Sequence, residues 1–73
     1  MKNKIRLETL ADINDFVNIV STVEGPVRLE DGTGFVVNAK SLIGAMYTVE
    51  WEELWCVSEA DIYRKIERFI ADE

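Results

Sequence analysis

Histidine is missing from the sequence and cysteine occurs once, at Cys56, so the side chains that hold zinc in most proteins are nearly absent. A zinc site needs several of these residues close together, and a single thiol cannot form an internal disulfide. Cys56 stands in an apolar run, where a small core residue is more typical than a nucleophile. These residues therefore predict neither a zinc site nor a disulfide framework.

Long apolar runs are missing as well. The chain has no stretch of about 18 apolar residues that would cross a membrane as a helix. Met1 to Lys4 lead into an alternating polar segment and not into the apolar core of a signal peptide. We therefore expect a cytoplasmic protein with no membrane insertion.

Positive charge is scarce. The chain has 8 Lys and Arg residues against 14 Asp and Glu residues, which gives a net charge of -6, and its basic residues are scattered along the sequence. Nucleic-acid binding needs clustered Lys and Arg to neutralise phosphates. A nucleic acid is therefore not an expected partner.

The chain does have the composition of one small globular domain. Of its 73 residues, 48% are hydrophobic and 30% are charged. A chain of this length buries only about 60% of the surface that it exposes when unfolded, so we expect modest stability. We therefore expect residues 1–73 to form a single domain.

Four segments predict β-strands, because their apolar and polar residues alternate or form short apolar runs. They lie at residues 5–9, 27–30, 35–37 and 54–57. Ile5 and Leu7 of the first are expected to point inward. Residues 31–34 contain two glycines and suit a hairpin turn between the second and third strands. Residues 48–50 are expected to form a loop.

Capping patterns predict where the first and last helices begin. The first helix is expected over about residues 10–23, after a capping box of Thr9 and Asp12, and Gly25 suits its C-terminal cap. Ser58 and Asp61 form a second capping box before the last helix. The apolar stripe of the last helix is Ile62, Ile66, Phe69 and Ile70. Asp72 and Glu73 oppose the dipole of that helix and are expected to fray.

With a central helix between the third and fourth strands, the element order is β-α-β-β-α-β-α. This order predicts an α+β fold in which three helices cover one face of a four-stranded antiparallel sheet. The apolar faces of these elements define the expected core. It consists of Ile13, Phe16, Val17, Val20, Leu29, Leu54, Ile62, Ile66 and Phe69.

The central helix is expected to begin at Asn38, a strong N-cap residue, so that Ser41 is the third residue of its first turn. The nine residues from Asn38 to Met46 resemble the helix after the central hairpin of HPr, the histidine-containing phosphocarrier of the sugar phosphotransferase system. In that family the helix reads close to Asn-Ala-Lys-Ser, then two apolar residues and often Gly-x-Met. The element order of the whole chain is similar too, and implies an HPr-like open-faced β-sandwich with strand order 1-4-2-3.

The resemblance also reveals a departure. HPr carries phosphate on a histidine in a segment similar to Gly-Leu-His-Ala-Arg-Pro, between its first strand and first helix. The corresponding residues here, Leu7 to Asp12, are fewer, lack the Gly and the Arg-Pro pair, and are acidic where phosphate needs positive charge. We therefore expect no phosphocarrier activity, no enzymatic activity and no cofactor.

Catabolite repression HPr is a subfamily that has likewise lost the histidine and kept the serine. By this resemblance Ser41 is the predicted regulatory phosphorylation site, and HPr kinase or a carbon-catabolite regulator is the implied protein partner. The predicted partner-binding residues are Lys40, Ser41, Leu42, Ile43, Met46 and Tyr47.

Two alternative functions remain open. The domain would serve only for assembly, with itself or another protein, through the apolar residues of the same helix, or it would be a divergent phosphocarrier with another acceptor. Three weaker signals have ordinary explanations. Glu50, Glu52 and Glu53 are typical of a solvated acidic edge, and Asp31 to Gly34 are typical of a turn. Trp51 and Trp55 are expected to be core or interface residues.

Overall fold

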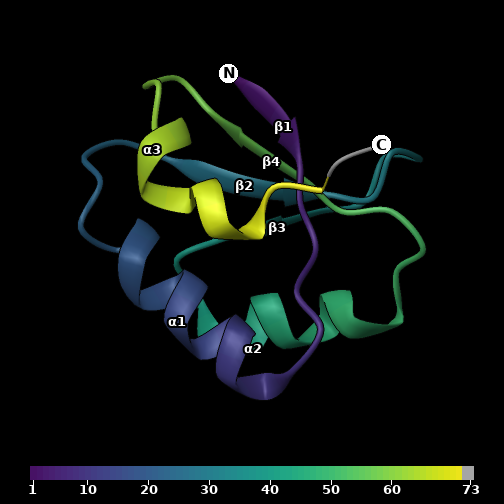
Figure 1. Cartoon of the computed structure of the whole chain (residues 1–73). Coiled ribbons are helices and arrows are strands. Elements are labelled where there is room, and N and C mark those ends of the chain that lie inside the picture. The colour runs from purple at the N-terminus through teal and green to yellow at the C-terminus, as the bar shows by residue number, and fades with distance from the viewer. Residues whose placement is uncertain (72–73) are drawn as a thin grey trace.

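The computed structural model describes residues 1–71 and has the predicted α+β fold, with three helices and a four-stranded antiparallel sheet (Figure 1). The expected fraying of Asp72 and Glu73 lies outside the described residues. The strands are β1 (Lys2–Lys4), β2 (Val27–Glu30), β3 (Val36–Asn38) and β4 (Trp55–Ser58). The helices are α1 (Leu10–Val20), α2 (Leu42–Met46) and α3 (Tyr63–Ile66), with 3-10 turns η1 (Tyr47–Glu50) and η2 (Glu67–Phe69).

The sheet has the order β1-β4-β2-β3, which confirms the order that the HPr resemblance implied. Leu29 of β2 pairs with Cys56 of β4 on one side and with Val37 of β3 on the other. Leu29 and Cys56 are fully buried and face the helices. Because successive strand residues point to opposite faces, their neighbours along each strand face the other way. The helices therefore cover one face of the sheet, and the other face stays open.

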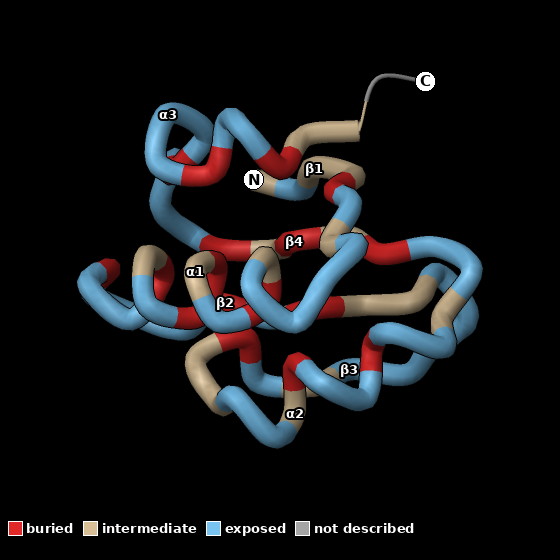
Figure 2. The backbone as a smooth tube through the Cα atoms, turned by 60° about the horizontal axis from the view of Figure 1, so that its bottom comes forward, coloured by how far each residue is buried: buried red, intermediate tan, exposed pale blue. Residues whose placement is uncertain are grey.

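The core lies between the helices and the sheet, where buried segments from both layers meet (Figure 2). All nine predicted core residues are buried. The rings of Phe16 and Phe69 meet edge to face with their centroids 5.5 Å apart, which ties α1 to η2. Cys56 is fully buried, as predicted, and burial raises the pKa of its thiol to about 11.

The start of α1 confirms the first capping box. The side chain of Thr9 accepts a hydrogen bond from the amide of Asp12 at 3.0 Å, and the carboxylate of Asp12 accepts one from the amide of Glu8 at 3.1 Å. The helix ends at Val20, three residues before the predicted end. The hydroxyl of Thr22 donates a hydrogen bond to the carbonyl of Ile19, where the chain leaves the helix.

The first strand was predicted too late in the chain. It spans Lys2–Lys4, and after Ile5 the chain turns from β4 toward the C-terminal segment. The amide of Ile5 still donates to Leu54, but the amide of Arg6 donates to the carbonyl of Phe69 at 2.8 Å. Ile5 is buried and Leu7 packs against the core, as predicted.

The second capping box was wrong. Ser58 belongs to β4, and its hydroxyl donates to the carbonyl of Ala60 instead of capping a helix. The helix starts only at Tyr63 and gives way to a 3-10 turn after Ile66. Its apolar stripe is largely right, since Ile62, Ile66 and Phe69 are buried and Ile70 is partly buried.

Candidate functional site

Ser41 is the N-cap of α2, not a residue inside its first turn. Its side chain accepts a hydrogen bond from the amide of Gly44 at 3.1 Å. Asn38, predicted as the cap, is the last residue of β3, and its side chain accepts from the amide of Lys40. The sheet pairing continues through Asn38 to Ala39, whose amide donates to Val27, so the helix cannot start earlier.

The end of α2 extends directly into η1, where a loop was predicted. Together they bury Ala45 and Thr48, and the hydroxyl of Thr48 donates to the carbonyl of Ala45 at 2.7 Å. This one inward stripe leaves most of the apolar side chains of the segment in solvent. We call these exposed residues the α2 surface: Leu42, Ile43, Met46, Tyr47 and Val49.

The α2 surface is strongly exposed for a protein of this size. Ile43 is 71% and Tyr47 68% exposed, and Leu42 and Met46 are each 42% exposed. Val49 is 55% exposed and was missed from the sequence, although it follows Met46 at helical spacing. Single exposed apolar residues are ordinary, but a contiguous group marks an interaction site. The α2 surface is therefore the candidate functional site.

Lys40, which was predicted to be part of the site, is partly engaged elsewhere. Its ammonium group donates to the carbonyl of Val23 at 2.5 Å, just beyond the end of α1. This contact joins the segment before α2 to the turn after α1. The remaining predicted residues, from Ser41 to Tyr47, lie together along one short helical segment.

The segment before α1, which the HPr resemblance matches to the phosphate-carrying segment, is acidic. Arg68 reaches Asp15 at 3.4 Å and Asp12 at 3.8 Å, and Arg6 lies 3.9 Å from Glu8. Both guanidinium groups thus have carboxylates beside them, and these carboxylates would repel a phosphate. The arrangement ties η2 to α1, and the cavity between them is lined by two arginines together with the carboxylates of Glu8 and Asp12.

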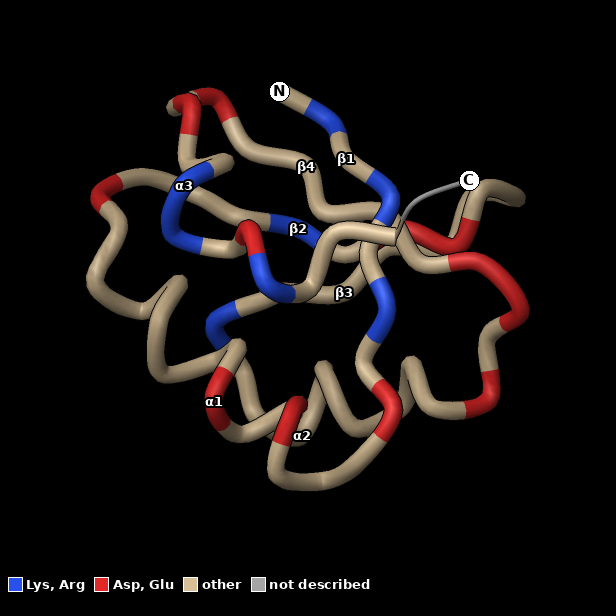
Figure 3. The backbone as a smooth tube through the Cα atoms, viewed as in Figure 1, with Lys and Arg blue, Asp and Glu red and all other residues tan. Residues whose placement is uncertain are grey.

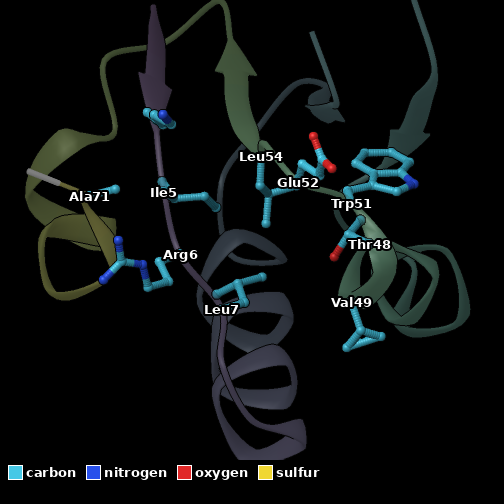
Figure 4. A pocket seen from close by; sticks show the side chains of 10 residues that line it. Ile5, Arg6, Leu7, Thr48, Val49, Trp51, Glu52, Leu54 and Ala71 are labelled. Carbon is cyan, nitrogen blue, oxygen red and sulfur yellow. The ribbon is translucent and has the colours of Figure 1, made fainter. Parts of the chain in front are cut away.

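A small cavity of about 180 Å³ lies between the segment after β1 and the segment from η1 to β4 (Figure 4). Ile5 and Leu7 line one side, and Val49, Trp51 and Leu54 line the other. Sites for small organic ligands are usually about 300–1,000 Å³, so this cavity is too small for most of them.

The weaker sequence signals have structural explanations. Asp31 accepts hydrogen bonds from the amides of Thr33 and Phe35, which close the predicted turn, and the bond from Thr33 is the main reason why the pKa of Asp31 is lowered. Trp51 packs against the core, and the indole of Trp55 donates to Glu53. Within residues 1–71 no three acidic or cysteine side chains cluster closely enough to hold a metal ion.

Comparisons of the chain with protein-family models, with curated proteins and with solved structures found no match. Among residues 1–71 no helix has the length and apolar character needed to cross a membrane. The HPr resemblance therefore depends on residues 38–46 and on the order and arrangement of the elements.

Proposed function

We propose that this chain is an HPr-like protein-binding module that works without a phosphohistidine and docks a partner protein through the α2 surface. The observation that carries the proposal is the exposure of Ile43 and Tyr47, at 71% and 68%, one helical turn apart. Their side chains make a protruding apolar ridge that suits a groove on a partner. Burying it on a partner would remove apolar area from water, at about 25 cal/mol per Å² before the costs of association.

The charges near the α2 surface favour a partner with a basic rim. Residues 41–49 carry no charge, Glu50 follows them, and α1, which packs beside α2, carries Asp12 and Asp15. Complementary charge at the edge of an interface steers association and selects partners. By the HPr resemblance, the partner would be HPr kinase or a carbon-catabolite regulator, and the location would be the cytoplasm.

Ser41 would regulate this docking. A phosphate on its hydroxyl adds about -1.5 to -2 charge beside Leu42 and Ile43, and it retains oxygens that can accept from the amide of Gly44. The added charge would strengthen binding to a basic partner without remodelling the fold. Incubation with ATP and an HPr kinase, followed by mass spectrometry, tests this step, with Ser41→Ala as the control. Absence of phosphate on Ser41 would leave docking without this regulation.

Docking itself is tested by affinity capture from the source cells with Ile43→Asp and with Phe35→Asp. Phe35 is 69% exposed, but it lies before β3 and outside the α2 surface. Phe35→Asp is therefore a control that also replaces an exposed apolar side chain with a carboxylate. We expect one protein to be captured by the parent and by Phe35→Asp and to be lost with Ile43→Asp. Equal capture by both variants would contradict docking through α2.

The alternative use of the α2 surface is assembly of the chain with itself. The same exposed apolar residues would then meet across two copies. Sedimentation velocity over a range of concentrations distinguishes self-assembly from binding to another protein. A mass that doubles with concentration for the parent, but not for Ile43→Asp, would favour the assembly module over the partner-binding module.

A further inference from the structure

The sheet face opposite the helices carries a second, differently built surface. The strand register places two rows of side chains, with members from all four strands, on this face. We call it the open face: Lys2 and Lys4 of β1, Trp55 and Val57 of β4, Arg28 and Glu30 of β2, and Val36 and Asn38 of β3.

The charge of the open face differs from that of the rest of the chain. The whole chain is acidic, with a net charge of -6. The open face instead has Lys2, Lys4 and Arg28 against the carboxylate of Glu30, with the carboxylate of Glu53 beside Trp55 at its edge. Figure 3 shows basic positions along β1 and β2, while acidic positions are spread over the loops and helices around the sheet. Folding thus collects basic residues that are scattered in the sequence.

Trp55 lies at the centre of this basic group. The Nζ atoms of Lys2 and Lys4 lie 5.2 and 6.0 Å from the centre of its ring, within the range of a cation–π interaction. The indole nitrogen donates to the carboxylate of Glu53 at 3.0 Å. The ring and both ammonium groups are therefore positioned before anything binds, which lowers the entropic cost of binding.

The carboxylate of Glu30 is shared between two cations. The Nζ atom of Lys2 lies 3.9 Å from one of its oxygens, and the Nε atom of Arg28 lies 3.6 Å from the other. Lys2, Arg28 and Glu30 together therefore carry a net charge of +1. A carboxylate from outside would add to the network without displacing Glu30.

We propose that the open face binds an extended acidic segment of a partner protein. Its carboxylates would pair with Lys2, Lys4 and Arg28, and one apolar side chain would lie against the partly exposed Trp55 and Val57. A single-stranded nucleic acid suits the face less, because successive bases stack on several aromatic rings and Trp55 is the one aromatic residue of the open face. This surface is on the opposite side of the domain from the helices, so it is independent of docking through α2.

The test is a titration of the isotope-labelled chain with a Glu-rich decapeptide that has one central Phe, followed by NMR. We expect the indole signal of Trp55 to move while that of Trp51, which packs against the core, stays in place. The same peptide with Gln in place of Glu is expected to move neither signal. Movement of both indole signals together, or of neither, would overturn the proposal.

Two double variants with the same change in charge distinguish an effect of the open face from an effect of net charge. Lys2→Glu with Arg28→Glu is expected to weaken peptide binding about tenfold or more, whereas Arg64→Glu with Lys65→Glu, on α3, should weaken it less than about threefold. Equal losses would overturn the proposal, as would tighter binding of a thymidine decamer than of the peptide. If the first variant does not fold, Lys2→Gln and Arg28→Gln replace it singly, and each must weaken binding.

Discussion

Phe16 and Phe69 are the residues on which the core most depends. They are both buried, and their rings join the first helix to the last turn of the chain. Phe16→Ala or Phe69→Ala is expected to lower the free energy of unfolding by about 3–5 kcal/mol, most of the stability of so small a domain. Phe35→Ala, at an exposed position, should change it by about 0.5 kcal/mol or less. Denaturant unfolding measures all three, and equal stability of a core variant and the control would be evidence against this core.

Cys56 gives a prediction for pH. Burial raises the pKa of its thiol from 9.0 to about 11, so between these values the unfolded chain loses a proton that the folded chain keeps. The free energy of unfolding should therefore be unaffected by this thiol below pH 9 and fall by about 1.4 kcal/mol per pH unit toward pH 11. The measurement is the difference in stability between the parent and Cys56→Ala at pH 8 and at pH 10.5. A difference that does not shrink at the higher pH would show that the thiol titrates normally.

At the scale of elements, the start of α2 can be tested by removing its cap. Ser41→Ala removes the acceptor for the amide of Gly44 and is expected to cost about 1 kcal/mol. Asn38→Ala removes an acceptor in the turn before the helix and should leave the helix start at Leu42 unchanged. Amide hydrogen exchange at Gly44 follows the cap directly. Faster exchange of the Gly44 amide in Asn38→Ala than in Ser41→Ala would show that Asn38, and not Ser41, caps the helix.

Much of the architecture could be predicted from the sequence because its apolar spacing is regular. The buried face of α1 and the whole of β2 follow from period alone. The ends of short elements could not be predicted in the same way. Asn38 and Ser58 have the side chains of helix caps, yet sheet pairing holds both in strands, and tertiary contacts outweigh local preference. The open face was not foreseen, since Lys2, Arg28 and Trp55 meet only through the strand register.

For the whole molecule, the absence of histidine and the acidic region around Asp12 lead to a prediction about phosphate transfer. In a reconstituted relay with phosphoenolpyruvate and enzyme I, this chain should not accept phosphate or pass it to a sugar-specific acceptor. Labelled phosphate on the chain that is stable to base and labile to acid, as a phosphoramidate is, would refute the prediction. An HPr with an intact histidine serves as the positive control.

The two proposed surfaces lie on opposite sides of one small domain, and each has its own chemistry. The α2 surface is apolar and uncharged, whereas the open face combines basic residues with Trp55. Under the two proposals, the domain would hold two partners at once. Loss of binding at one surface through Ile43→Asp is therefore expected to leave the Trp55 response to the acidic peptide unchanged.

Docking through α2 is the central claim, and photo-crosslinking in the source cells tests it most directly. A photoreactive phenylalanine is placed at position 43 in one variant and at position 35 in another, both positions being exposed apolar sites. The account predicts a covalent adduct with one protein from position 43 and none from position 35. An adduct from position 35 alone, or from both positions equally, would contradict docking through the α2 surface.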